Sequence, residues 1–438
     1  MHSHSDSESS DDFIINTPAI INFHNAISAL YDEVEKTRVL NNRPRPSRAP
    51  QLHLLDEWKI DHPELFQRKL RVNPEVFTCI IDKISAHPIF HNASNNPQLP
   101  VPIQLAIFLN AAGHYGNAAT SQDIAEWAGV SVGTVHNCYK RVMIAILAQH
   151  DDLIHFDMEN PRDVADKRKA KEYAEVRTCS QWKGGFLCVD GTPFNLFQKP
   201  GWHGEGFFDR KSNYSLSNQI VIFPHNLRIV DYSIGVPGSL HDSNAFQHTL
   251  CAQSPESFFG NNEWLWADSA YACHKWCVVP FKKPTGGSLS WAQKTFNYHL
   301  SRVCHPPLSY YRKNINLSNK IRVRSEHFYG SLKGRFQSLR ELRVQIQTPD
   351  DLQYATTWIR CCLILHNMIV EIEEDFGLAP SHDQFAREYE RLQEEREGGN
   401  DEGDLDEEGG GEGNFIGSAG QRFRNTLMDH LLQHLNHE

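Results

Sequence analysis

Three acidic residues in this chain have surroundings typical of metal ligands. Asp190 follows the apolar run Gly-Gly-Phe-Leu-Cys-Val, Asp268 follows Glu-Trp-Leu-Trp-Ala, and Glu326 begins a basic, helical stretch. Both runs have strand character and end at turn residues, Gly191 and Ser269. A carboxylate at the end of a buried strand is costly unless its charge is neutralised, and a divalent metal is the usual partner. Three such groups can hold two Mg²⁺ ions for in-line phosphoryl transfer, so a DNA-cutting enzyme is the leading hypothesis.

A fourth acid, Asp242, follows His241 in the stretch Gly-Ser-Leu-His-Asp-Ser. We expect it at the N-terminus of a helix that comes after a strand. An aspartate there caps backbone amides without a metal, and this is the favoured interpretation. An active-site function, with His241 orienting a water molecule, stays open.

The segments that must position these acids change character along the chain. Between residues 183 and 285 the apolar runs are short and strand-like, whereas the later segments repeat apolar residues at helical spacing. The predicted strands are Gln219–Phe223, Ile229–Val236, Trp264–Asp268 and Cys277–Phe281. The predicted helices are Pro74–Ile84, Pro102–Ala112, His241–Leu250, Trp291–Arg302, Ile321–Leu342 and Asp351–Glu371.

A second motif, at residues 121–143, precedes this region and has the spacing of a helix-turn-helix. Ala125 is small where two helices cross, Gly129 allows a left-handed turn, and Ser131 is placed to cap the second helix. That helix would present polar and basic side chains suited to a DNA groove and its phosphates: Thr134, His136, Asn137, Lys140 and Arg141. The alternative is an all-helical bundle that makes no DNA contact.

The net charge of −11 is concentrated in one segment of the 438 residues. Glu371–Glu412 contains seventeen acidic residues and three arginines, so the net charge of the remaining chain is close to +3. The overall acidity therefore does not argue against DNA binding. We expect a low-order segment at 1–50, a helical region at 51–150, a catalytic domain at 183–370, and an acidic, largely disordered tail at 371–438. One amphipathic helix is predicted at Ile14–Val39 and a short amphipathic helix at Arg422–Leu435.

The ten cysteines are scattered and lack the spacing of a disulfide framework, which fits a reducing compartment. We see no apolar run of membrane-spanning length and no secretory signal. We therefore expect an intracellular protein that does not contact a membrane, and a nuclear one if its substrate is chromosomal.

Several ordered motifs give the chain a resemblance to the PIF/Harbinger-type transposases and their domesticated nuclease relatives. They span about residues 185–370. The motifs are Cys188-Val-Asp-Gly-Thr-Pro, Asp209-Arg-Lys-Ser-Asn-Tyr, Gly235-Val-Pro-Gly-Ser-Leu-His-Asp-Ser, Ala267-Asp-Ser-Ala-Tyr, Arg324-Ser-Glu-His-Phe-Tyr-Gly-Ser-Leu-Lys-Gly-Arg and Leu365-His-Asn. Each motif is weak alone, and the ordered set is strong.

The resemblance implies an α/β fold with a ribonuclease H-like catalytic domain, a mixed sheet flanked by helices, after the all-α region. It implies that Asp190, Asp268 and Glu326 bind Mg²⁺ or Mn²⁺ and that the substrate is DNA. A Myb-like DNA-binding partner and a homo-oligomer are also expected. Four basic residues near the acids are candidate DNA contacts, although an ordinary solvated surface is an equal alternative: Arg210, Lys211, Lys333 and Arg335.

Two alternatives stay open at this point. The chain could be a domesticated DNA-binding or assembly protein that keeps the fold and has lost cleavage. In addition, residues 303–320 interrupt the family pattern before Glu326, and deleting them restores a continuous helical lead into that residue. We hypothesise that they are an unspliced intron, because Val-Cys can be encoded by the donor sequence GTATGT. The competing interpretation is a genuine loop.

Overall fold

The computed structural model describes residues 17–36, 50–92, 95, 97–116, 120–284, 286–303, 324–397 and 418–437. It divides into two compact units, Met1–Ser47 and Arg48–Glu438. The first contains one helix, α1 (Thr17–Lys36), which lies within the range predicted from the sequence. Nearly all of the 303–320 segment and residues 398–417 lie outside the described residues.

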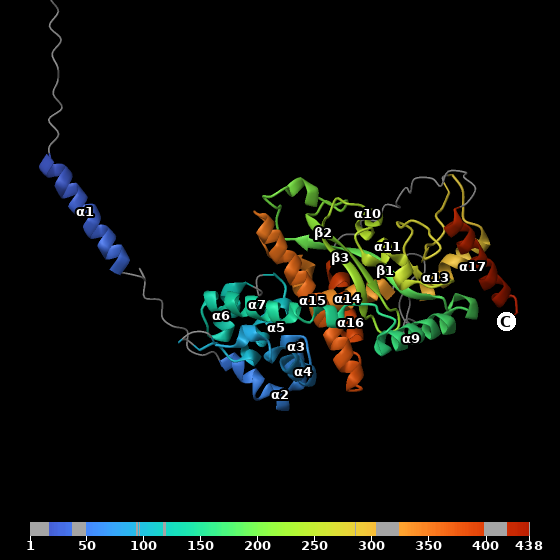
Figure 1. Ribbon diagram of the computed structural model, residues 1–438, viewed down its shortest axis with the longest axis horizontal. Helices are drawn as coiled ribbons and strands as arrows, with labels where there is room; N and C mark the ends of the chain where they lie inside the picture. The colour runs from blue at the N-terminus through green and yellow to red at the C-terminus, as the bar shows by residue number, and fades with distance from the viewer. Residues whose placement is uncertain are drawn as a thin grey trace, which may run out of the picture. The chain divides into compact units, whose positions relative to one another are not determined.

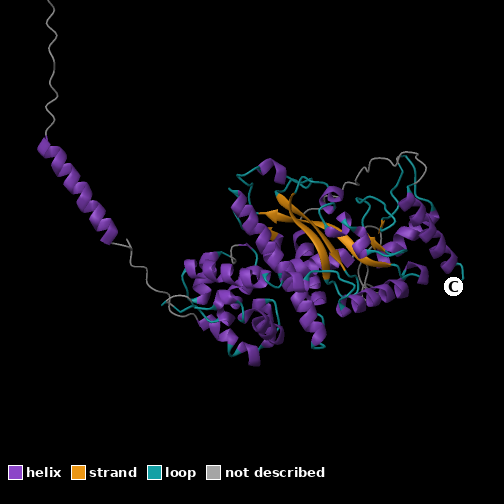
Figure 2. Ribbon diagram, in the orientation of Figure 1, coloured by secondary structure: helices purple, strands orange, loops and turns teal. Residues whose placement is uncertain are grey.

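The second unit is built around a mixed sheet (Figure 2). Its strands are β1 (Gly185–Leu196), β2 (Ser215–Ile222), β3 (Ile229–Pro237), β4 (Trp264–Trp266), β5 (Cys277–Val278) and β6 (Glu341–Leu342). The order is β3-β2-β1-β4-β5, with β6 also pairing with β1. The β1–β2 and β2–β3 pairs are antiparallel, and β1 is parallel to β4 and β6, as is β4 to β5.

Helices cover both faces of this sheet (Figure 1). Alternate residues of a strand point to opposite faces, and the two apolar clusters divide accordingly. Cys188 and Ile220 belong to the cluster packed by α14 (Arg324–Arg335) and α15 (Pro349–Asp375). Val189 and Val221 belong to the cluster packed by α10 (Asp242–Phe246), α11 (Leu250–Gln253) and α12 (Pro255–Phe258). The expected fold class, a mixed sheet flanked by helices after a helical region, is confirmed.

In the helical region before the sheet, helices begin close to the positions that the sequence predicts. Proline occupies an early position of α3 (Pro63–Leu70), α4 (Pro74–Ser85) and α5 (Val101–Gly113), where a missing amide costs nothing. This region also contains α2 (Trp58–Asp61), α6 (Ser121–Ala128), α7 (Val132–Leu147), α8 (His150–Leu153) and the 3-10 turns η1 (Pro50–Leu55) and η2 (Pro88–Phe90). Helix α9 (Pro161–Arg177) and the turn η4 (Ser180–Trp182) lead into β1.

The helical region and the sheet share one core. Phe108 of α5 and Tyr139 of α7 contact Trp358 of α15, with ring centroids 4.9 and 5.5 Å apart. The same apolar cluster continues from these residues to the sheet-facing helices. The region expected at 51–150 is therefore packed within the same compact unit as the sheet.

Two predicted helices are wrong in their extent. Helix α14 ends at Arg335 rather than near Leu342, because the chain turns through η7 (Gln337–Arg340) and forms β6, which pairs with Asn195–Leu196 of β1. The helix predicted at His241–Leu250 breaks after Phe246, and Thr249 caps the separate helix α11.

The expectation of a largely disordered tail after residue 371 does not fit the described part. Helix α16 (His382–Glu397) packs along α14, and α17 (Ala419–Leu435) packs near α13 (Trp291–Val303). The indole Nε1 of Trp182 donates to the carbonyl oxygen of Leu427 at 2.9 Å, and Arg424 donates to that of Pro280 at 3.1 Å. The prediction of disorder rested on the acidic composition of the segment, which does not reveal the apolar faces by which these helices pack.

None of the helices in the described part of the chain is both long and apolar enough to cross a membrane. The nine cysteines among the described residues form no disulfide with one another. Cys361 and Cys362 are core residues of α15, and Nε2 of nearby His366 lies 2.9 Å from the carbonyl oxygen of Leu227. Burial lowers the pKa of His366 to about 3.

Candidate active site

Asp190 and Asp268 occupy equivalent positions on neighbouring parallel strands. Cys188 of β1 pairs with Trp266 of β4, and each aspartate lies two residues beyond its member of this pair. Residues two apart point to the same face, so both carboxylates emerge on the face that α14 covers. Each Oδ1 accepts a hydrogen bond from the next backbone N–H, at 2.8 Å for Asp190 and 2.6 Å for Asp268.

The sequence analysis placed Asp190 at the end of its strand, and this is wrong. Strand β1 continues to Leu196, paired with β2, while its pairing with β4 stops at Cys188. Asp190 therefore lies where β1 loses a neighbour on one side, and its half-exposed side chain is accessible there.

Helix α14, which carries Glu326, packs against β1 at Asp190. The hydroxyl of Tyr329 donates to the carbonyl oxygen of Asp190 at 2.6 Å, and Lys333 Nζ donates to Thr192 Oγ1 at 2.8 Å. These contacts lay α14 along β1. Glu326 is exposed and lies three residues before Tyr329, which places it on the same side of the helix. Glu326 thus lies about one helical turn before the residue that contacts Asp190. In the described part of the chain, however, the ligand atoms of the three acids do not form a group within 4.8 Å of one another.

Lys333 and Arg335 do not lie on a surface open to DNA. Lys333 is 9% exposed and its Nζ also bonds the carbonyl oxygen of Pro193 at 2.9 Å. Arg335 is 1% exposed and donates to Ser381 of the segment before α16. Their expected function as DNA contacts therefore needs correction, because α14 uses these cations to fix its position against β1 and α16.

The electrostatics around Lys333 follow from this burial. Desolvation, helped by the positive charges of Lys211 and Arg340, lowers the pKa of Lys333 from 10.5 to about 7. The negative charge of Asp190 opposes that shift. Lys333 therefore fixes α14 to β1 through its hydrogen bonds, and its charge state depends on burial and on the neighbouring charges.

Asp242 does not cap the helix it begins. The cap of α10 is His241, whose ring Nδ1 accepts from the backbone N–H of Ser243 at 3.2 Å. Asp242 Oδ1 instead accepts from Nε2 of Gln219 at 2.9 Å, so its side chain turns toward the sheet. The capping interpretation of Asp242 is therefore wrong, and His241 has the function that was expected of its neighbour.

The helical corner at α6 and α7 has the local geometry expected from the sequence. Gly129 ends α6 with a φ of +64°, and Ser131 Oγ accepts from the N–H of Thr134 at 3.2 Å. On α7, His136, Asn137 and Lys140 are exposed, whereas Thr134 and Arg141 are half-buried. Arg210 and Lys211 lie on an exposed turn between β1 and β2.

The donor set at the acids fits a hard divalent cation. All three predicted ligands offer carboxylate oxygens, which Mg²⁺ and Mn²⁺ prefer. The buried neighbours Tyr271 and Tyr329 use their hydroxyls as hydrogen-bond donors to Gln219 and to the Asp190 carbonyl oxygen. The sequence analysis missed both tyrosines, although each lies three residues after a predicted acid.

A separate group of possible ligands lies elsewhere. Asp166, His225 and Glu374 have ligand atoms within 4.8 Å of one another. Two buried or half-buried arginines already neutralise these carboxylates: Arg228 Nε donates to Asp166 at 2.8 Å, and Arg162 lies 3.2 Å from Glu374. We interpret this group as an ion-pair network between α9, the β2–β3 turn and α15.

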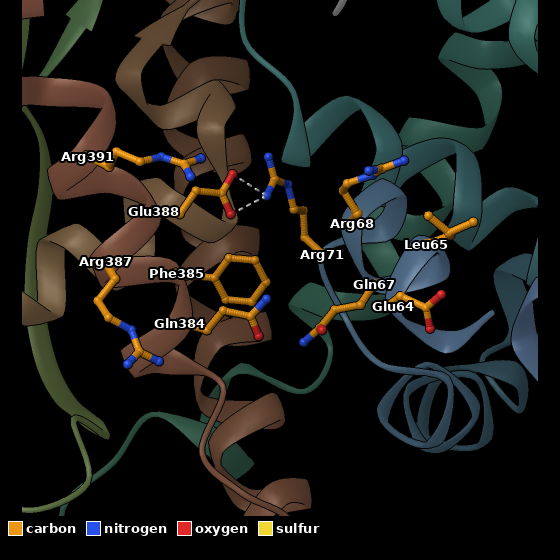
Figure 3. Close-up of a pocket in the computed structure, with 10 residues that line it drawn as sticks. All are labelled: Glu64, Leu65, Gln67, Arg68, Arg71, Gln384, Phe385, Arg387, Glu388 and Arg391. Carbon is orange, nitrogen blue, oxygen red and sulfur yellow. Dashed lines mark hydrogen bonds and ion pairs between the residues drawn. The ribbon is translucent and has the colours of Figure 1, made fainter. Parts of the chain in front are cut away.

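A cleft of about 560 Å³ lies between α3 and α16 (Figure 3). The guanidinium of Arg71 spans it and bonds both carboxylate oxygens of Glu388, at 2.8 and 2.9 Å. Because α16 also packs along α14, this contact links the helical region to the helix that carries Glu326.

Comparison with known proteins decides the type of domain. Residues 189–306 match the family model described as DDE superfamily endonuclease. This part of the chain, which we call the DDE domain, is similar to DDE superfamily endonucleases. The matched range includes Asp190 and Asp268, and Glu326 lies beyond its end.

The chain is also similar to a curated protein. Over 176 residues the chain is 24% identical to "Putative nuclease HARBI1" of Rattus norvegicus, an alignment that covers 40% of this chain and 48% of that protein. The chain thus spans about half the length of the curated relative it matches. These matches confirm the resemblance to Harbinger-type, transposase-derived nucleases. No solved structure matches the chain.

Proposed function

We propose that the DDE domain is a Mg²⁺- or Mn²⁺-dependent endonuclease that cuts phosphodiester bonds of DNA by hydrolysis or strand transfer. The observation that supports the proposal is the register of β1 and β4, in which Asp190 and Asp268 each lie two residues beyond a paired residue, toward the face covered by α14. Three carboxylates on rigid, hydrogen-bonded elements are an arrangement suited to holding hard cations.

When bound, the metal would supply a Lewis acid for the phosphate and a lowered pKa for an attacking water molecule. The proposal includes two such ions acting on one phosphodiester bond. The chain's own contribution is to hold and orient. Asp190 and Asp268 are fixed by the amides of Gly191 and Ser269, and Glu326 is placed by the bond from Tyr329 to β1.

DNA would be engaged by exposed cations and polar groups outside the acids. The exposed side of α7 offers His136, Asn137 and Lys140, and the turn before β2 offers Arg210 and Lys211. Base edges and phosphates are the groups that such residues bind. A nuclear location, a Myb-like partner and a homo-oligomer belong to the same proposal.

Metal removal tests this function. Supercoiled plasmid is incubated with the full chain in Mg²⁺, in Mn²⁺, and in EDTA followed by added metal. We expect nicking with either ion, none in EDTA, and recovery after Mn²⁺ is restored. DNA that is bound but uncut under every condition would instead support the domesticated, non-cleaving alternative.

A further inference from the structure

The chain between two of the predicted acids carries positive charge only. Residues 269–325, which lie between Asp268 and Glu326, contain ten lysines and arginines and no aspartate or glutamate, although the whole chain has 54 acidic residues. The described part of this stretch includes β5 and α13, and three of its lysines are exposed there: Lys282, Lys283 and Lys294. A run of one charge sign of this length attracts a polyanion such as the DNA backbone.

The first two of these lysines follow the strand next to Asp268. Strands β4 and β5 are parallel, and Trp266 pairs with Val278. Asp268 lies two residues beyond this pair on its own chain segment, and Lys282 and Lys283 come soon after the pair on the other. The carboxyl ends of parallel strands meet at one edge of a sheet, where ligands of such sheets bind. The lysines therefore leave the sheet at the edge that carries Asp268.

Helix α13 fixes the segment that carries these lysines. The side-chain amide of Asn297 accepts from the backbone N–H of Phe281 at 2.8 Å and donates to the carbonyl oxygen of Phe281 at 2.9 Å. The ring of Phe296 packs edge-on against that of Phe281, with centroids 5.2 Å apart. Because Phe281 directly precedes Lys282 and Lys283, these contacts join both lysines to α13.

The exposed side of α13 combines two aromatic rings with a lysine. Trp291 is 69% exposed, Tyr298 is 48% exposed, and the exposed Lys294 lies between them in the sequence. Spacings of three and four residues put these side chains on one side of the helix, and we call them the α13 aromatic face. Reciprocal hydrogen bonds between Ser290 and Gln293 cap the helix and hold Trp291 at its first position.

An unpaired nucleic-acid strand fits the α13 aromatic face better than an intact duplex does. Exposed aromatic side chains stack on bases that are unpaired, whereas the bases of a duplex stack on one another. Lysines beside the rings bind the phosphates of the same strand. The lack of acidic residues throughout 269–325 favours such a polyanion over a protein partner of mixed charge.

We propose that the α13 aromatic face, together with Lys282 and Lys283, binds an unpaired DNA strand beside the predicted metal ligands, with Trp291 as the platform on which a base stacks. The inference rests on the proposed function and names the form of DNA that this function acts on. It adds a DNA contact surface to the exposed residues of α7 and of the turn before β2.

Fluorescence anisotropy of labelled DNA with the full chain in EDTA tests this inference without cleavage. The probes are a single-stranded oligothymidylate of about 20 nucleotides, which exceeds a typical binding site, and a blunt duplex of the same length. We expect Trp291→Ala to weaken single-strand binding about fivefold or more, because one stacked base is lost, and to change duplex binding by less than about twofold. Trp291→Phe keeps a stacking ring and should retain most of the single-strand affinity.

Phe376→Ala is the matched control for the loss of an exposed ring. Phe376 is 64% exposed and follows the acidic residues Glu374 and Asp375, so its removal should leave the affinity for both probes unchanged. Replacement of both Lys282 and Lys283 by alanine tests the charge. We expect the slope of log affinity against log salt for the single strand to fall by about 1.4, which is about 0.7 for each lost phosphate contact.

Three results would overturn this inference alone. They are parental single-strand affinity in Trp291→Ala, an equal loss for single strand and duplex in that variant, and a parent chain that binds the duplex but not the single strand. A parent chain that binds neither probe would contradict the proposed DNA-directed function itself.

Discussion

The hydroxyl of Tyr329 donates a 2.6 Å hydrogen bond to the carbonyl oxygen of Asp190, and this bond joins the helix of one predicted ligand to the strand of another. Both partners are well placed: Tyr329 is buried, and Asp190 lies where β1 loses its β4 neighbour. The spacing of the acids therefore depends on one neutral hydroxyl that never has to touch the substrate.

Tyr329→Phe removes that donor and keeps the ring. We expect a loss of about 1 kcal/mol in the free energy of unfolding, because one buried hydrogen bond disappears. We also expect a cleavage rate at least about tenfold lower, because Glu326 is less well fixed. Chemical denaturation and plasmid nicking measure the two effects. Tyr31→Phe on α1, at a site that is 71% exposed, should change neither. Parental cleavage by Tyr329→Phe would show that the bond does not position Glu326.

Lys333 gives stability a distinctive pH dependence. Its pKa is about 7 in the folded chain, against 10.5 for an ordinary lysine, so the unfolded chain binds the extra proton between these pH values. Stability must then rise with pH across this window, by up to about 1.4 kcal/mol per pH unit from this group, and the penalty is complete below pH 7. The difference in unfolding free energy between parent and Lys333→Met, measured from pH 6 to 10, should follow this course. Parallel curves would contradict the lowered pKa.

Arg71 and Glu388 should couple the helical region to α16 energetically (Figure 3). Their side chains are 8% and 26% exposed, and Nη1 of Arg71 donates to both carboxylate oxygens of Glu388. A double-mutant cycle with Arg71→Met and Glu388→Gln should therefore give about 1–3 kcal/mol of coupling. The matched pair is Arg391–Glu395, which is 3.9 Å apart and 70% and 64% exposed, and it should give below about 0.5 kcal/mol. Equal coupling in the two cycles would show that the α3–α16 contact is an ordinary surface pair.

Lys140 on α7 should contact a DNA phosphate if the helical corner binds DNA. Lys140→Ala is then expected to weaken binding similarly for all sequences and to reduce the slope of log affinity against log salt by about 1. Fluorescence anisotropy at several salt concentrations measures both. Lys183→Ala, at an exposed lysine just before β1, is the matched control. An unchanged slope for Lys140→Ala would favour the all-helical bundle without DNA contact.

The sequence predicted the acids better than it predicted their surroundings. Asp190 and Asp268 were identifiable because each follows an apolar run within a recognisable motif, and Gly129 and Ser131 because turn and cap chemistry is local. The orientation of Asp242 was not predictable, since it depends on the β1–β2 register that sets Gln219 opposite Gly191.

The sequence also failed to predict which basic side chains are buried. The sequence predicts that Arg335 is a surface residue of a basic helix. It is buried instead, because α16 packs over it, although the acidic composition of the α16 segment predicted disorder. The average composition of that segment does not reveal Phe385 and Ala386, the buried residues through which α16 packs against the rest of the fold.

The most direct test of the central claim is Mn²⁺-dependent DNA cleavage by the parent chain and by Asp268→Asn, each with and without residues 303–320. The amide keeps the size of the carboxylate and removes the charge that a metal needs. We predict cleavage by the parent in at least one of the two lengths, and a loss of about a hundredfold or more in Asp268→Asn with DNA binding retained. Cleavage by Asp268→Asn at the parental rate would contradict the assignment of the metal centre to Asp190, Asp268 and Glu326.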